Sequence, residues 1–198
     1  MKIYVNNELI EVQLEGEKNI GDVLKSFEIT CEENNAAVIG IIIDGKKITA
    51  DDFDSVSQQE FSESTKIEFS VVTEQNIKDS FANLASLFQD LSTAMENVPT
   101  LLQNNKNNEV ANSITKLADN IDSFSHIAAL SSLFPNTFSD IKIDDQELNN
   151  FFNDFSPILL DFENALKSND SVLIGDLSEY EICPRLKSLS KALIQFTK

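Results

Sequence analysis

The fold is decided by residues 66–88, which read KIEFSVVTEQNIKDSFANLASLF. Up to Thr73, apolar and polar residues alternate from Ile67 onward, as in a strand that buries one face. After Thr73, apolar residues recur every three or four positions from Ile77 onward, which is typical of an amphipathic helix. The change of period predicts an α+β protein made of two domains, residues 1–73 and residues 74–198.

The first 73 residues contain several strand patterns and one helix pattern. We expect a β-hairpin in residues 2–14 with its turn at Asn6-Asn7, a helix in 19–27, a strand in 37–43, a turn at Asp44-Gly45 with a short strand after it, and a last strand in 66–72. This order resembles the ubiquitin-like β-grasp fold. The resemblance implies a small sheet that serves as a docking surface or spacer. The chain lacks the exposed Gly-Gly tail of ubiquitin-like modifiers and sulfur carriers, so neither conjugation nor sulfur transfer is expected.

The remaining residues predict an antiparallel four-helix bundle, because four amphipathic stripes are joined by short connections. The third helix should begin after Ile143 with Asp144 near its N-cap, where a carboxylate opposes the helix dipole. Pro157 should kink that helix, and Pro184 should kink the fourth. The expected helices cover residues 74–99, 110–134, 144–166 and 171–196.

The composition restricts the classes of partner. The chain has 33 acidic and 15 basic residues and a net charge of -18, which disfavours binding to a nucleic-acid backbone and leaves basic or neutral protein partners open. No stretch approaches the length of a membrane span, and the N-terminus alternates where a signal peptide has an apolar core. Two distant cysteines fit a reducing compartment. We therefore expect a cytoplasmic protein.

Patterns for catalysis or metal binding are weak. His126 is the single histidine, and it lies on a helix beside apolar residues, where a structural role is more common than general-base catalysis. Cys183 could meet His126 if their helices are adjacent, but a small buried thiol is the more common role. The chain has neither a glycine-rich phosphate loop nor ligands at zinc or calcium spacing. We expect no enzyme activity, catalytic residues, metal or cofactor.

A polar cluster lies in residues 172–186, which read VLIGDLSEYEICPRL. On a helix, Asp176, Glu179, Tyr180 and Cys183 lie along one line beside the apolar stripe. This cluster either fixes the helix register at the Pro184 kink or forms an acidic partner-binding patch around Tyr180. A pocket for a small molecule or a reaction around Asp176, Tyr180 and Cys183 is an alternative. The segment also resembles one in uncharacterised bacterial helical proteins without assigned activity, which implies a shared architecture and nothing catalytic.

The predicted function is that of a noncatalytic adaptor or chaperone-like protein. It would bind a protein client of unknown identity through an acidic surface or an apolar groove of the bundle. Phe151, Phe152 and Phe155 widen the stripe of the third helix, so they are either the groove or ordinary core. A structural subunit that forms a homodimer through a bundle face remains the other alternative.

Overall fold

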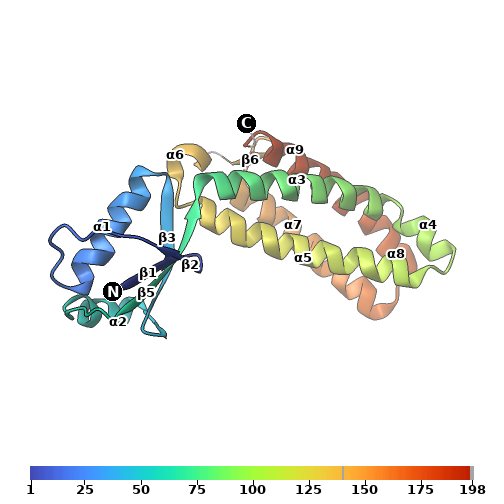
Figure 1. Ribbon diagram of the computed structural model, residues 1–198. Helices are drawn as coiled ribbons and strands as arrows, with labels where there is room; N and C mark the ends of the chain where they lie inside the picture. The colour runs from blue at the N-terminus through green and yellow to red at the C-terminus, as the bar shows by residue number, and fades with distance from the viewer. Residues whose placement is uncertain (140, 197–198) are drawn as a thin grey trace. The chain divides into compact units, whose positions relative to one another are not determined.

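The computed structural model describes residues 1–139 and 141–196, which form an α+β protein (Figure 1). The chain divides into two compact units, Met1–Asn76 and Ile77–Lys198. The first contains a mixed sheet with two helices, and the second is a helical bundle.

The sheet of the first unit has five strands in the order β2-β1-β5-β3-β4. Strand β1 runs parallel to β5, and the other neighbours are antiparallel. Helix α1 covers one face, where Phe27 stacks on Phe69 of β5 with ring centroids 3.8 Å apart. The elements are β1 Lys2–Val5, β2 Glu8–Ile10, α1 Ile20–Glu33, β3 Ala36–Ile43, β4 Lys46–Lys47, α2 Ala50–Ser57 and β5 Lys66–Thr73.

Both predicted hairpin turns of this unit are confirmed. Asn6 and Asn7 have φ of 49° and 71°, and Asp44 and Gly45 have φ of 48° and 83°. Positive φ at both central residues defines the turn type whose twist matches that of paired strands. The side chain of Asn6 also accepts from the N–H of Val71 at 2.9 Å and donates to its carbonyl at 3.0 Å. The first turn therefore also holds β5 in place.

The strand-to-helix switch occurs where the sequence pattern changes. Strand β5 ends at Thr73 and helix α3 begins at Glu74. The hydroxyl of Thr73 accepts from the Asn76 N–H, and the Asn76 side chain accepts from the Thr73 N–H, both at 3.0 Å. This reciprocal pair satisfies backbone donors that the first turn of a helix leaves open.

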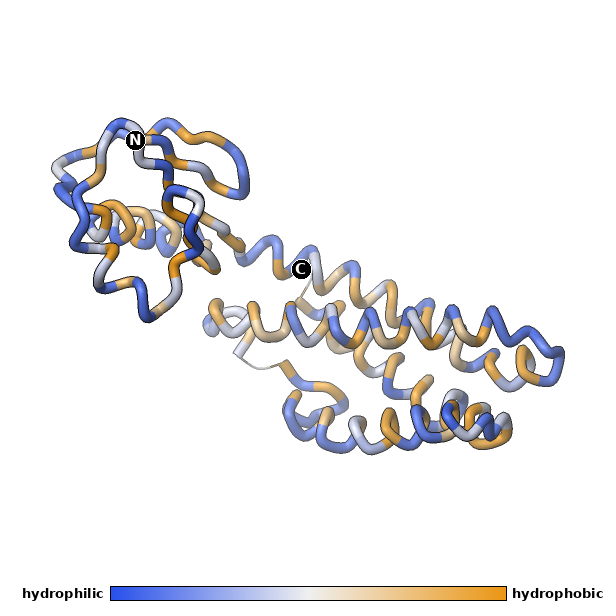
Figure 2. The backbone as a smooth tube through the Cα atoms, turned by 90° about the horizontal axis from the view of Figure 1, so that it is seen from below, coloured by the Kyte–Doolittle hydropathy of each residue, from blue (hydrophilic) through white to orange (hydrophobic). Residues whose placement is uncertain are grey.

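The second unit packs its longest helices around phenylalanine rings. Phe124 lies 6.4 Å from Phe81, 6.0 Å from Phe88 and 5.5 Å from Phe152 between ring centroids. Figure 2 shows hydrophobic and hydrophilic segments alternating along the long helices, as expected when one face is buried. The elements are α3 Glu74–Glu96, α4 Val98–Gln103, α5 Asn107–Ser131, α6 Pro135–Phe138, β6 Lys142–Ile143, β7 Gln146–Glu147, α7 Leu148–Ser168, α8 Ser171–Asp176, η1 Leu177–Ile182 and α9 Cys183–Ile194.

Three predictions about individual elements were wrong or incomplete. Asp144 does not cap α7, because Asp144 and Asp145 have φ of 49° and 63° and form the turn between β6 and β7. The fourth expected helix is divided into α8, the π-helical segment η1 and α9. Helix α2 was not predicted, although Thr49 and Asp52 form a capping box at its start. Short-range turn and capping chemistry decides the structure at Asp144 and at α2, whereas the division of the fourth helix lies just before Pro184, which lacks a backbone N–H.

Candidate functional site

The phenylalanines of α7 are part of the core of the bundle. Phe155 is 0% exposed and Phe151 is 6% exposed, and their ring centroids are 5.7 Å apart. Phe152 is half-buried and stacks on Phe124 of α5. A partner would reach Phe151 and Phe155 only if the bundle opened. Within the folded bundle, these two rings stabilise the interior.

The polar residues of the segment 172–186 face different surroundings. Tyr180 is 65% exposed, whereas Cys183 is 2% exposed. The charge of Glu179, and then its hydrogen bond with the phenol, raise the pKa of Tyr180, with a smaller contribution from Asp176. Asp176, Glu179 and Tyr180 form an acidic patch at the surface, and Cys183 does not share it.

Cys183 instead lies beside a contact between α9 and α3. Its Sγ is 4.0 Å from the Oε2 atom of Glu96, which also accepts from the Nζ atom of Lys187 at 3.1 Å. The hydrogen bond to Glu96, followed by that to Cys183, raises the pKa of Lys187. In the same helix pair, the buried hydroxyl of Ser190 donates to the Ala85 carbonyl at 2.7 Å. These contacts fix the antiparallel register of α3 and α9.

The expected weak point before Pro184 is a π-helical segment. The backbone N–H of Cys183 donates to the Ser178 carbonyl, five residues back. The Nη1 atom of Arg185 donates to the Glu181 carbonyl at 2.9 Å and to the Glu181 carboxylate at 2.7 Å. A proline cannot donate to the preceding turn; here the π-turn pairs the Ser178 carbonyl, and the arginine pairs the Glu181 carbonyl.

His126 and Cys183, the candidate catalytic pair, lie in different surroundings. His126 is exposed on α5, whereas Cys183 is buried in α9. In residues 1–139 and 141–196, no group of three or more His, Cys, Asp or Glu side chains is arranged to hold a metal ion. Within the same ranges, no helix is long and apolar enough to cross a membrane.

An apolar groove lies between α5 and α7, and we call it the α5–α7 groove. Its volume is about 240 Å³. Leu117 and Phe162 are almost fully buried, and the other apolar lining residues keep part of their surface exposed. The charged lining residue Glu163 is paired with Lys167 at 2.6 Å. The groove is lined by Ile114, Leu117, Ala118 and Ile121 of α5 and by Leu159, Phe162, Glu163 and Leu166 of α7.

Sequence reasoning identified these stripes as core and did not identify the groove. Ile114, Leu117 and Ile121 fit the apolar period of α5, as Leu159, Phe162 and Leu166 fit that of α7. The available sequence signal was Ala118, which places a small side chain next to a leucine on the apolar face. At this position the methyl group of Ala118 covers less of the neighbouring apolar side chains than a leucine would.

Comparisons with known proteins cover nearly the whole chain. Residues 1–73 match the model of the TP0873 N-terminal domain, and residues 79–192 match that of a domain of unknown function, DUF8042. The chain is 21% identical over 194 residues to a Treponema pallidum (strain Nichols) protein described as "Uncharacterized protein", covering 98% of this chain and 96% of the relative. No solved structure matches. The expected similarity to an uncharacterised bacterial protein is thereby confirmed.

Proposed function

We propose that this chain, which belongs to the family of the domain of unknown function DUF8042, is a noncatalytic adaptor that binds an amphipathic helix of a partner protein in the α5–α7 groove. The observation that carries the proposal is the groove itself, an almost wholly apolar surface left open between two long helices. Soluble proteins use such surfaces to bind the apolar face of a helix.

The spacing of the lining residues fits a helical ligand. On α5 the lining positions are 114, 117, 118 and 121, and on α7 they are 159, 162, 163 and 166. Both sets follow the spacing i, i+3, i+4 and i+7, so each helix presents one straight stripe along about 10 Å of its axis. A ligand helix of about two turns would place a matching stripe between the two.

The charge around the groove favours a basic ligand. Asp119 and Asp122 follow lining residues of α5, Asp161 lies between lining residues of α7, and all three are exposed. Lys116 and Lys167 are exposed bases next to lining positions, and Lys167 is paired with the lining residue Glu163. The whole chain carries a net charge of -18. A helix with lysine or arginine beside its apolar face would therefore be attracted and oriented by the rim.

The proposal also includes a specific fold for each of the two parts of the chain. We infer that residues 1–73 form a β-grasp domain that acts as a docking surface or spacer. The sheet order β2-β1-β5-β3-β4, with α1 packed across the sheet, supports this. We also infer that residues 74–198 form a four-helix bundle of α3, α5, α7 and the combined α8, η1 and α9.

The test is a binding titration with a synthetic helical peptide. The probe is a fluorescent peptide of about 14 residues with leucine at one i, i+3, i+4, i+7 stripe and lysine or arginine elsewhere. Ala118 is exposed in the groove, so Ala118→Arg should block the groove without disturbing the core. We expect Ala118→Arg to weaken binding at least about tenfold in fluorescence anisotropy, because its side chain occupies the groove and repels the basic ligand.

The matched control is Ser123→Arg, which adds the same charge to an exposed position on α5. Ser123 is five positions after Ala118, which places it about 140° around the helix axis from Ala118 and away from the groove. The Ser123→Arg variant should bind the peptide with the same affinity as the wild type. Equal affinities for both variants, or equal binding of a peptide with a scrambled leucine stripe, would contradict the proposal. A dimer in sedimentation velocity that Ala118→Arg dissociates would support the homo-oligomer alternative instead.

A further inference from the structure

Strand β3 has an edge that is only partly covered by a neighbouring strand. Strand β4 has two residues, which pair with Ile42 and Ile43. One more contact follows, in which the Ile48 N–H donates to the Ile41 carbonyl at 2.9 Å. Farther along β3, toward Ala36, no strand of the described residues pairs on this side. An uncovered strand edge can accept another strand through its backbone.

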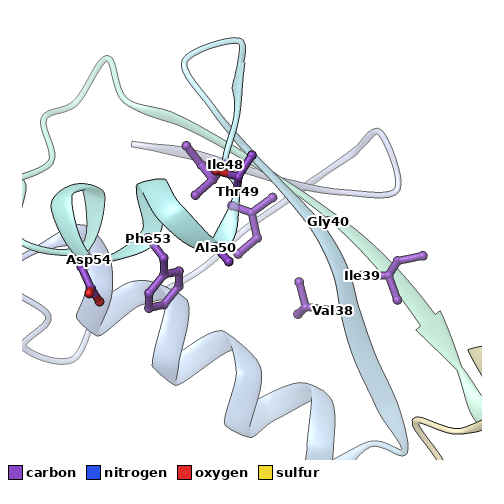
Figure 3. A pocket seen from close by; sticks show the side chains of 9 residues that line it. Val38, Ile39, Gly40, Ile48, Thr49, Ala50, Phe53 and Asp54 are labelled. Atoms are coloured by element: carbon purple, nitrogen blue, oxygen red, sulfur yellow. The ribbon is translucent and has the colours of Figure 1, made fainter.

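An apolar hollow lies directly beside this uncovered edge. Its volume is about 450 Å³, and it lies between β3 and α2, with Ile48 at one end. Figure 3 shows Val38 on β3 and the ring of Phe53 on α2 pointing into the same open space. Phe53 is 43% exposed. We call this the β3–α2 hollow.

The neighbouring residue Ile39 adds to the exposed apolar surface. It is the extra residue where the register between β3 and β5 shifts between Val38 and Gly40, and it is 47% exposed. A β-bulge often redirects a side chain at the border of a sheet. Ile39 lies along the unpaired edge on the side of β3 away from Phe53 (Figure 3), so it extends the exposed apolar surface that a bound strand would contact.

The charge beside the hollow is negative. Asp54 lines the hollow, and Asp51 is exposed in the first turn of α2. The nearby Lys46 is paired with Asp52 at 2.7 Å. Lys47 follows Lys46 in β4 and projects to the face of the sheet opposite that of Lys46, because side chains alternate along a strand. Acids at the rim therefore favour a ligand that carries basic residues.

A second copy of this chain does not fit this charge pattern. Residues 1–73 contain 15 acidic and six basic residues, a net charge of -9. Two such units brought together at this edge would repel one another. The occupant that fits both the backbone edge and the charge is a basic segment of a different protein.

We propose that the uncovered edge of β3 and the β3–α2 hollow bind an extended, basic segment of a partner protein. The segment adds a strand beside residues 38–41 and places one apolar side chain against Phe53. Its lysine or arginine side chains approach Asp54 and Asp51. This site is separate from the α5–α7 groove and does not depend on the proposed helix binding.

The experiment uses the full chain and a fluorescent peptide with the sequence Lys-Val-Arg-Ile-Lys-Ile-Arg-Val-Lys. Nine residues span about 30 Å as a strand, enough to cover the uncovered edge. We expect Phe53→Ala to weaken binding about tenfold, because the anchoring side chain loses its apolar contact. Asp54→Lys should weaken binding about threefold or more, since it replaces an attraction with a repulsion.

Leu9→Ala is the matched control within the same sheet. Leu9 is 60% exposed on β2, the strand at the opposite edge. Leu9→Ala should bind as the wild type does. A peptide with glutamate in place of its bases, or with proline at alternate positions, should not bind, because it lacks the charge or the strand N–H groups.

Several outcomes would overturn the proposal. One is an affinity that neither Phe53→Ala nor Asp54→Lys changes, and another is a loss of affinity in Leu9→Ala alone. Equal binding of the proline peptide would exclude strand addition, and a dimer that Phe53→Ala dissociates would identify a second copy as the occupant. If Phe53→Ala lowers the melting temperature, Asp54→Lys, which removes no apolar contact, decides the outcome. Because its mutations lie in residues 1–76, this test can fail while that of the α5–α7 groove succeeds.

Discussion

Phe155→Ala should strongly destabilise the bundle. Phe155 is 0% exposed, its ring centroid lies 5.7 Å from that of Phe151 and 6.4 Å from that of Phe152, and the guanidinium carbon of Arg185 lies 6.0 Å from the ring. Burial of such a side chain contributes about 1.5–3 kcal/mol, and each aromatic contact adds about 0.5–1.5 kcal/mol. With the cavity left behind, the expected loss in the free energy of unfolding is about 3–5 kcal/mol.

The assay is urea unfolding of the full chain followed by circular dichroism at a wavelength that reports helix content. The urea dependence of the free energy of unfolding is about 1–3 kcal/mol per molar for small proteins. A loss of about 3 kcal/mol should therefore lower the urea midpoint by at least about 1 M.

The control is Leu160→Ala on the same helix. Leu160 is 56% exposed, so its truncation should change the free energy of unfolding by less than about 0.5 kcal/mol. If the midpoints of Phe155→Ala and Leu160→Ala coincide, Phe155 is not a core residue and the reasoning from its burial is refuted.

Two further predictions concern the first unit. Gly21→Ala should destabilise this unit, because the new Cβ would lie 2.7 Å from Ser57 Cβ and 2.9 Å from the Ser57 carbonyl oxygen, so α1 and α2 must separate. Faster amide hydrogen exchange in residues 1–76 would show the loss of stability. The control is Gly175→Ala, whose Cβ would lie at an ordinary 3.5 Å from Pro99 and should leave amide exchange in the bundle unchanged. The hydrogen bond from Lys46, and then those from Thr49, lower the pKa of Asp52 from 3.8 to about 2. The pKa of Asp52 is lower in the folded than in the unfolded state, so ionised Asp52 stabilises the fold above pH 3.8, and this contribution is lost as the pH falls toward 2. Asp52→Asn should therefore lower the urea midpoint of the first unit at pH 7, and its difference from the wild type should narrow below pH 4; a constant difference would contradict the assignment.

Local chemistry made part of the fold predictable. The Asp44-Gly45 turn could be predicted because few residues tolerate positive φ, and the change of period at Thr73 marks the residue where β5 ends. Asp144 shows the limit of the same reasoning. An aspartate suits both a helix N-cap and a tight turn, and the pairing of β6 with β7 selects the turn.

The candidate sites were less predictable than the elements that form them. The stripes of α5 and α7 could be read from the sequence, but Leu117 and Phe162 became the floor of a groove because the neighbouring helices leave that side of the pair open. Phe151 and Phe155 have the same period, and the structure buries them under other helices. The β3–α2 hollow depends on the short helix α2, whose eight residues are too few for a clear apolar period.

By itself, the sequence determined the strands of residues 1–73, the long helices α3, α5 and α7, the switch from strand to helix at Thr73 and Glu74, and the acidic charge of both halves. These properties depend on the φ, the period and the ionisation of residues close together in the chain. Only the tertiary structure decided which apolar faces are covered, because burial depends on the number and position of neighbours that come from distant parts of the chain. For that reason Phe155 is core, whereas Ala118 and Phe53 lie on surfaces that a partner could cover.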